Sequence, residues 1–232
     1  MIPIKDDNPS RIFPVVTILL IMANVAVFVF QWTLGKSAQA FIVRYGAIPW
    51  EISHFRELAH LDPALQTGWP SAATLFSSMF IHGGILHLVG NMLYLWIFGD
   101  NVEGLTGHVR FFFFYIVCGL AAALTHVALE PNSTIPMVGA SGAISGVLGA
   151  YLVRFPGARV HVLIFLFWFI RVVRVPAVVV LGLWFVLQIL NGLGSLGIRG
   201  GGGVAWFAHI GGFVAGILLL FFFEKRRRVR GW

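Results

Sequence analysis

Residues 204–223 read VAWFAHIGGFVAGILLLFFF, a run of twenty residues in which His209 is the one ionisable side chain. A helix needs roughly 20 apolar residues to cross the hydrocarbon core of a bilayer. The basic sequence Lys225–Arg228 follows almost directly, as is typical of the cytoplasmic end of a span. The sequence therefore predicts a transmembrane helix that carries a histidine in its first half.

The whole chain has the composition of a membrane protein. Of its 232 residues, 58% are hydrophobic and 11% are charged, whereas soluble domains carry about 25% charged residues. The formal net charge of +7 would also fit a nucleic-acid-binding protein, but the basic residues stand at the ends of apolar runs, where they set membrane topology. We therefore expect a lipid bilayer around the protein and no nucleic-acid partner.

Further apolar runs upstream predict an all-α membrane protein with six transmembrane helices. A longer mixed segment, residues 35–71, is too polar to span and is expected to form a partly helical loop on the membrane surface. The predicted spans are residues 13–34, 72–98, 111–129, 138–155, 176–190 and 204–223. Residues 1–12, 13–223 and 224–232 are then a short N-terminal segment, the transmembrane domain and a basic tail.

One short apolar segment, residues 161–170, decides the number of spans. As a helix, ten residues rise about 15 Å, which is half of a bilayer core, so we expect an interfacial excursion, with a hairpin as one possible form. With six spans, twelve Lys and Arg side chains lie on the side of both termini and four on the other. This split follows the positive-inside rule and predicts that both termini are cytoplasmic.

Polar side chains gather in the outer half of three predicted spans, which all run from outside to inside. Polar groups in lipid are costly and mark functional sites by default, so these residues are expected to meet in one outward-facing, water-filled cavity. Small residues four apart, as at Gly142 and Gly146 and at Gly212 and Gly216, would let two of these helices approach closely. The polar residues are His82, His87 and Asn91, then Ser141 and Ser145, then His209, with Gln188 near the outer end of the fifth span.

Each of these residues also has a plainer explanation when it is taken alone. A serine in a transmembrane helix commonly donates to a backbone carbonyl one turn earlier. An asparagine commonly bonds to a neighbouring helix, and a histidine can be a packed core residue. The combination of residues carries the functional interpretation.

Three motifs together resemble the rhomboid family of intramembrane serine proteases. They are Gly139-Ala140-Ser141-Gly142, similar to GxSG; Ala208-His209-Ile210-Gly211-Gly212, similar to AHxxG; and the spacing of His82, His87 and Asn91. The stretch Gly99–Glu103 resembles a loop found in many bacterial members. The order of the motifs matches over nearly the whole chain, which implies a bacterial-type, six-helix rhomboid in the plasma (inner) membrane.

The resemblance implies a Ser–His dyad that needs no metal or cofactor. Ser141 would be the nucleophile and His209 the general base, with an oxyanion hole formed by Asn91, His87 and the backbone N–H of Ser141. His82, Glu103, Gly139, Gly142 and Gly212 would be structural. His82 lies five positions before His87, about 140° around a continuous helix, which also argues for a structural role.

The implied reaction is hydrolysis of a peptide bond in or near a transmembrane segment of another protein. That substrate would approach sideways, near the second and fifth spans. The alternative is a catalytically inactive, rhomboid-like factor that binds membrane proteins; a transporter would require charged residues in mid-span. The oligomeric state is left open.

The sequence departs from the family at three positions. Ala73 and Thr74 stand where many members have Trp-Arg, and Ser145 stands where many have a tyrosine that stacks on the histidine. Ser145, one turn deeper than Ser141, is a weaker candidate nucleophile. The run Gly200–Gly203 is either a mobile lid or a plain connector, and the sequence favours neither.

Overall fold

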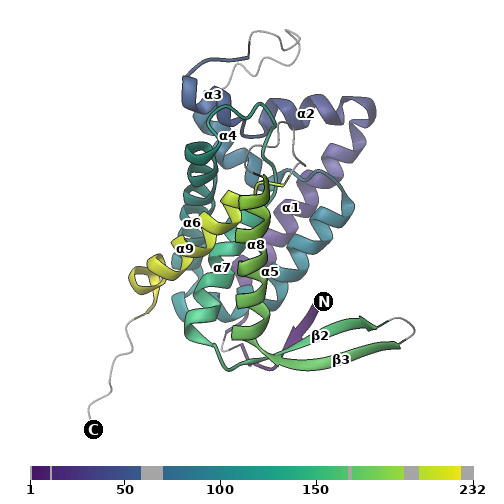
Figure 1. Cartoon of the computed structure of the whole chain (residues 1–232), viewed down its shortest axis with the longest axis vertical. Helices are drawn as coiled ribbons and strands as arrows, with labels where there is room; N and C mark the ends of the chain where they lie inside the picture. The colour runs from purple at the N-terminus through teal and green to yellow at the C-terminus, as the bar shows by residue number, and fades with distance from the viewer. Residues whose placement is uncertain (1, 11, 59–69, 167–168, 196–203, 226–232) are drawn as a thin grey trace.

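The computed structural model describes residues 2–10, 12–58, 70–166, 169–195 and 204–225. Within this part, the longer helices form one bundle (Figure 1). They are α1 (Val15–Thr33), α5 (Ile85–Thr106), α6 (His108–Leu129), α7 (Ser141–Arg154), α8 (Ala177–Ser195) and α9 (Trp206–Phe223). Four of them, α1, α6, α8 and α9, are long and apolar enough to cross a membrane. The chain is therefore a mostly helical membrane protein.

A bent pair of helices takes the place of the second predicted span. Helix α4 (Ser71–Ser77) and the 3₁₀ turn η3 (Ser78–Phe80) meet α5 at an angle of 79°, and together they make a fifth candidate span. The prediction of one continuous helix over residues 72–98 is wrong, because the chain breaks at residues 81–84. Gln31 of α1 compensates for the break: its Nε2 donates to the His82 carbonyl (2.8 Å) and its Oε1 accepts the His82 N–H (3.4 Å).

Short helices at one end of the bundle confirm a partly helical loop after the first span. They are η1 (Gly35–Ser37), α2 (Ala38–Tyr45) and α3 (Pro49–His54). The loop between α6 and α7 lies against them, because Ala47 and Met137 exchange two backbone hydrogen bonds of 3.0 and 2.8 Å. A further bond joins the N–H of Trp50 to the carbonyl of Ser133 (2.9 Å). We call this end, with α2–α4 and residues 130–140, the cavity end.

A three-stranded antiparallel sheet occupies the opposite end, so the expectation of an all-α chain is wrong. Strands β1 (Ile2–Asp6), β2 (Arg159–Leu166) and β3 (Phe169–Pro176) lie in the order β1-β2-β3. Alternate valines explain the strands: Val160 and Val162 are fully buried and pair with Val175 and Val173, as a period of two requires. The segment at residues 161–170 is thus a hairpin that returns the chain to the same end.

Pairs of polar side chains join neighbouring elements at this sheet end. Tyr151 donates to Asp6 (2.5 Å), and Asp7 lies 2.7 Å from the ring of His161, which lowers the pKa of Asp7. Arg154 at the end of α7 pairs with Glu224 just after α9 (2.9 Å). The N-terminal strand and the end of α9 therefore lie at the same end of the bundle (Figure 1).

Glu103, the acidic residue of the predicted motif, lies at this sheet end, fully buried. Its carboxylate accepts the N–H of Val16 (2.9 Å), the N–H of Thr17 (2.8 Å) and the Thr17 hydroxyl (2.7 Å), and it also bonds to His108 (2.6 Å). The first N–H groups of a helix have no partner within that helix, so Glu103 caps α1 from the last turns of α5. The stretch Gly99–Glu103 is therefore helical, and the prediction of a loop there is wrong.

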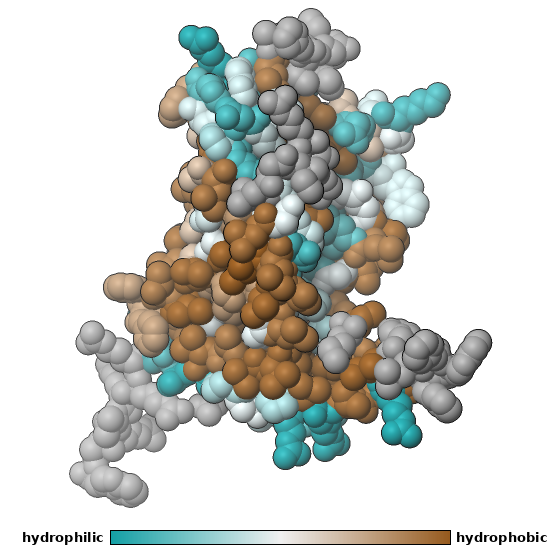
Figure 2. Space-filling model, in the orientation of Figure 1, coloured by the Kyte–Doolittle hydropathy of each residue, from teal (hydrophilic) through white to brown (hydrophobic). Residues whose placement is uncertain are grey.

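Helices α7 and α9 pack backbone against backbone, as the small residues predict. A methyl group added at Gly216 would lie 1.9 Å from the carbonyl oxygen of Gly146, and one at Gly212 would lie 2.1 Å from that of Gly142. Large apolar side chains of several helices face lipid instead. Figure 2 shows them as a hydrophobic surface between more hydrophilic ends.

Candidate active site

Ser141 is the first residue of α7, directly after a backbone turn that requires glycine. Gly139 has φ +122°, a conformation that side chains disfavour, and an added Cβ would lie 2.7 Å from the ring of His87. The N–H of Gly139 donates to the carbonyl of Ser78 (2.9 Å), which fixes the turn against η3. Both features hold Ser141 at the start of its helix, where the partial positive charge of the helix N-terminus favours an anion.

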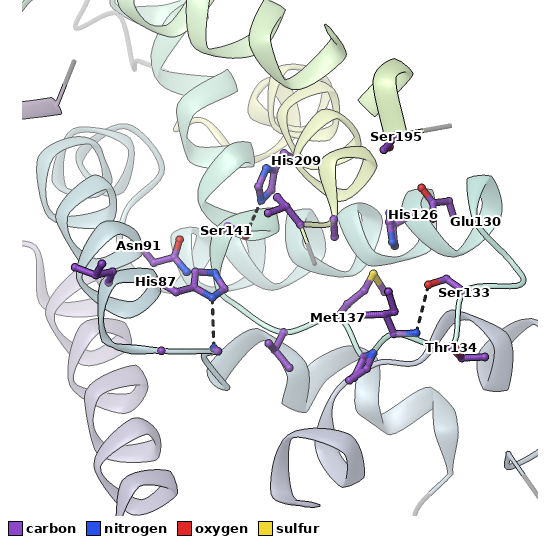
Figure 3. Close-up of a pocket in the computed structure, with 18 of the residues that line it drawn as sticks. His87, Asn91, His126, Glu130, Ser133, Thr134, Met137, Ser141, Ser195 and His209 are labelled. Carbon is purple, nitrogen blue, oxygen red and sulfur yellow. Dashed lines mark hydrogen bonds between the residues drawn. The ribbon is translucent and has the colours of Figure 1, made fainter. Parts of the chain in front are cut away.

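The His209 ring faces this serine from the neighbouring helix α9. Its Nε2 lies 2.8 Å from the Ser141 hydroxyl oxygen, a hydrogen-bond distance (Figure 3). The contact depends on the close packing described above, because Gly142 follows Ser141 and Gly212 lies one turn after His209 on the touching faces of the two helices. The structure thus brings together the two residues that the motifs single out.

Ser145, the weaker candidate nucleophile, bonds to the backbone of its own helix. Its side chain is buried, and its hydroxyl donates to the carbonyl of Ser141 in the same helix (2.6 Å). This is the backbone bond expected of a serine inside a transmembrane helix. The geometry favours Ser141 over Ser145.

Two side chains of α5 point toward Ser141 (Figure 3). The N–H of Gly83 donates to Nδ1 of His87 (3.4 Å), so a neutral His87 carries its proton on Nε2, beside Gly139. The Nδ2 atom of Asn91 is buried and has no hydrogen-bond partner among the described residues. His87, Asn91 and Ser141 line the same cavity.

His82 lies in the break before α5, so the argument from helix faces is wrong for this residue. Its ring is completely buried and meets the ring of His87 edge to face, with 5.1 Å between centroids. Its backbone is the part that Gln31 binds. His82 thus contacts the site through His87 and not directly.

A cavity of about 1090 Å³ is lined by Ser141, His209, His87 and Asn91. The loop before α7 lines one side of it with Asn132, Ser133 and Thr134, and α6 contributes His126 and Glu130. Nowhere in the described ranges do three His, Cys, Asp or Glu side chains gather in a way that could hold a metal ion. The run Gly200–Gly203, considered as a lid, lies outside the described residues.

Gln188 of α8 was expected only as a polar residue near the outer end of the fifth span, without a role. Its Oε1 lies 2.8 Å from Nδ1 of His209, the ring nitrogen that faces away from Ser141. The rings of Trp184 and Trp206 flank the histidine at centroid distances of 6.0 and 6.2 Å. The signal available in the sequence was a single amide in an otherwise apolar span, which does not identify its partner.

Comparison with known proteins places this arrangement in a family. The sequence matches the Rhomboid domain over residues 70–226, about two thirds of the chain. The chain belongs to the rhomboid family. Its rhomboid motifs lie on α5, α7 and α9 or directly before them, and Ala73 and Thr74, where many members have Trp-Arg, lie in the short helix α4.

Individual relatives differ in what their names say about activity. RHOMBOID-like protein 4 of Arabidopsis thaliana is 34% identical over 90% of the chain. Rhomboid protease GluP of Bacillus subtilis is 40% identical over 34% of the chain, and Inactive rhomboid protein 1 of Drosophila melanogaster is 28% identical over 73%. The chain spans about half the length of the plant rhomboid (52%) and less of the other two (15% and 11%). Because plant and insect proteins also match, these rhomboids do not assign the chain to a bacterial type.

Proposed function

We propose that this rhomboid is a serine endopeptidase that hydrolyses peptide bonds in or near transmembrane segments of other membrane proteins. The observation that carries the proposal is the 2.8 Å distance between the Ser141 hydroxyl and Nε2 of His209. A nucleophile within hydrogen-bond reach of a base is the signature of covalent hydrolytic catalysis. Both groups open into a cavity large enough for an extended segment of polypeptide.

The reaction would follow the usual order of acyl transfer. Ser141 Oγ attacks the scissile carbonyl carbon while His209 Nε2 takes the hydroxyl proton. His209 then gives that proton to the leaving amine, and an ester on Ser141 remains. A water molecule, deprotonated by His209, attacks this ester and releases the new carboxyl terminus and the free serine.

The oxyanion of each tetrahedral intermediate would be stabilised by the donors around Ser141. The N–H of Ser141 at the start of α7, Nδ2 of Asn91 and Nε2 of His87 are the proposed donors. Asn91 Nδ2 has no partner within the described ranges, which supports this role, because a donor left unpaired inside a protein is costly unless a ligand completes it. Such donors act on charge that develops in the transition state.

The proposed topology has six spans, with the cavity open to the outer face and both termini in the cytoplasm. Helix α7 has 14 residues, so it would begin below the outer surface, with the loop at residues 130–140 above it. The hairpin and the shared end of β1 and α9 support an even number of crossings. We place this protein in a bacterial plasma membrane on the resemblance of Gly99–Glu103 to bacterial members.

A second candidate function is that of an inactive rhomboid that binds membrane proteins. The similarity to a Drosophila protein named as inactive supports this alternative. Against it, Ser141 and His209 are both present and within hydrogen-bond distance of each other. The two functions differ in whether the serine reacts.

Labelling by a fluorophosphonate separates them. The purified protein in detergent should become labelled and should cleave a transmembrane model substrate, and Ser141→Ala should abolish both while its melting temperature stays unchanged. Ser145→Ala is the matched control and should keep both activities. Activity retained in Ser141→Ala would overturn the assignment, and an intact wild-type protein that neither labels nor cleaves would favour the inactive binding factor.

A further inference from the structure

Gln188 holds a fixed orientation beside the histidine. Its side chain is buried, and its amide nitrogen donates to the carbonyl of Trp184 one turn earlier in α8 (3.2 Å). Because a backbone carbonyl can only accept, that amide nitrogen is the donor end of the side chain. The carbonyl end, Oε1, is therefore the atom that lies 2.8 Å from Nδ1 of His209.

This orientation determines which nitrogen of His209 carries the proton. An amide oxygen accepts and cannot donate, so a neutral ring must carry its hydrogen on Nδ1 to make this bond. Nε2 is then unprotonated and directs its lone pair at the Ser141 hydroxyl. The other tautomer would place two acceptors against each other and leave the serine without a base.

We propose that Gln188 is the positioning residue of the site, which fixes the tautomer and ring orientation of His209 from helix α8. The proposal rests on the proposed function, because it assigns Gln188 a part in the same hydrolysis. It also accounts for Ser145: with no tyrosine at that position to stack on the ring, the amide of Gln188 holds the histidine instead. Gln188 touches neither substrate nor the reacting atoms.

The simpler explanation is that Gln188 only joins two helices. Hydrogen bonds between membrane helices contribute little to stability on average, so that role predicts a small change in stability and no change in chemistry. A positioning role predicts the reverse. The two explanations are separated by kcat and by the pH profile.

Two substitutions at residue 188 distinguish the roles. Gln188→Met keeps the length and removes the acceptor, so kcat should fall about tenfold to a hundredfold with KM and melting temperature nearly unchanged. Gln188→Glu keeps an acceptor and adds a negative charge, so it should restore most of kcat at neutral and higher pH. Because a carboxylate favours the protonated ring, the acidic limb of its kcat/KM profile should move to higher pH.

Among the residues that the structure describes, the other titratable groups facing this cavity are His87 of α5, His126 of α6 and Glu130 directly after α6. They are the same in every variant, so a shift between the wild-type and Gln188→Glu profiles reports on residue 188. Leu187→Met is the matched control on the exposed face of α8, and it should leave both kcat and the profile unchanged.

Wild-type kcat in Gln188→Met, or a lowered melting temperature with unchanged kcat, would overturn the proposal. If Gln188→Met does not fold, the Gln188→Glu profile decides, and an unshifted acidic limb overturns the proposal. If the wild-type protein fails to react with the fluorophosphonate, the proposed hydrolase itself fails. That outcome is distinct from a failure of Gln188, in which the wild type reacts and Gln188→Met reacts equally fast.

Discussion

The two ends of the bundle differ in how completely their buried polar side chains are hydrogen-bonded. At the sheet end, Glu103 makes four hydrogen bonds, and Asp6, Asp7 and Arg154 each have a side-chain partner. At the cavity end, Nδ2 of Asn91 and Nδ1 of His126 are buried without a partner in the described part of the chain. Other polar side chains at the cavity end are paired, as His209 is with Ser141 and Gln188, so Asn91 and His126 are exceptions within that end.

This difference separates groups that stabilise the fold from groups available to a ligand. An unpaired buried donor or acceptor costs about 1–3 kcal/mol, and Asn91 and His126 carry such groups among the residues that line the cavity, where a ligand could reach them. Substitutions at the sheet end should therefore change stability, and substitutions of donors at the cavity end should change turnover. Variants at both ends of the bundle test that division.

The largest effect is expected at Glu103. Glu103→Ala leaves the first N–H groups of α1 and the ring of His108 without their acceptor, and it should cost about 3–5 kcal/mol of stability. Activity per folded molecule should stay near that of wild type, because the cavity lies at the other end. Melting curves and active-site titration would test this. A folded Glu103→Ala protein with much lower kcat would break the division.

Next in size is Gly216→Ala at the contact of α7 and α9. The new methyl group would meet a backbone oxygen at 1.9 Å, so the helices must separate, at a cost of about 2–3 kcal/mol. This contact aligns Ser141 with His209, so turnover should fall as well. Gly182→Ala, with nothing near the added methyl group, is the control and should be neutral or more stable by up to about 1 kcal/mol. Equal melting temperatures for both variants would contradict the packing argument.

A smaller effect, on rate and not on stability, is expected at Asn91. Asn91→Ala should lower kcat about tenfold to a hundredfold, because it removes one of several oxyanion donors, with no loss in melting temperature. His82→Ala should do the opposite, lowering the melting temperature with a smaller change in kcat. Both would be measured in detergent with one substrate. A silent Asn91→Ala together with an inactive but stable His82→Ala would reverse the roles of these residues.

The smallest effect is expected at Asp7. Its hydrogen bond to His161 lowers the pKa of Asp7 below the ordinary value of 3.8. A lowered carboxyl pKa stabilises the fold above the unfolded-state value and ceases to do so as pH falls through the folded-state value. Melting temperatures from pH 7 down to pH 3 should therefore show a slight deficit for Asp7→Asn that disappears in acid. A deficit that grows in acid would contradict the assigned pairing.

The helices and their closest contact could be predicted because apolar length and small-residue spacing are local signals. The sheet could not be predicted: residues 159–176 are apolar apart from three arginines and His161, and such short apolar runs do not distinguish a strand from a helix. The break at Gly83 and Gly84 was also missed, because hydropathy averages across it. The structure reveals the break, because Gln31 of α1 bonds to the backbone of His82 there.

Within the candidate site, the meeting of Ser141 and His209 was predictable from the motifs, and their roles remain predictions. The position of His82 outside α5 was not predictable, because its angle to His87 was derived for an unbroken helix. Gln188 was visible as a polar residue in a span, but its partner belongs to another helix, and no spacing along the sequence connects residues 188 and 209. The structure supplies that link.

The pairing of β1 with β2 has a consequence for how the protein is made. Ile2 pairs with Leu163, so β1 leaves the ribosome long before its partner, and α1, α5, α6 and α7 are synthesised in between. Contacts between segments so distant in sequence form late. During synthesis, β1 therefore stays without its partner strand until the hairpin emerges. The sheet can close only after α1 to α7 have been synthesised, at a stage when α8 and α9 are still to follow.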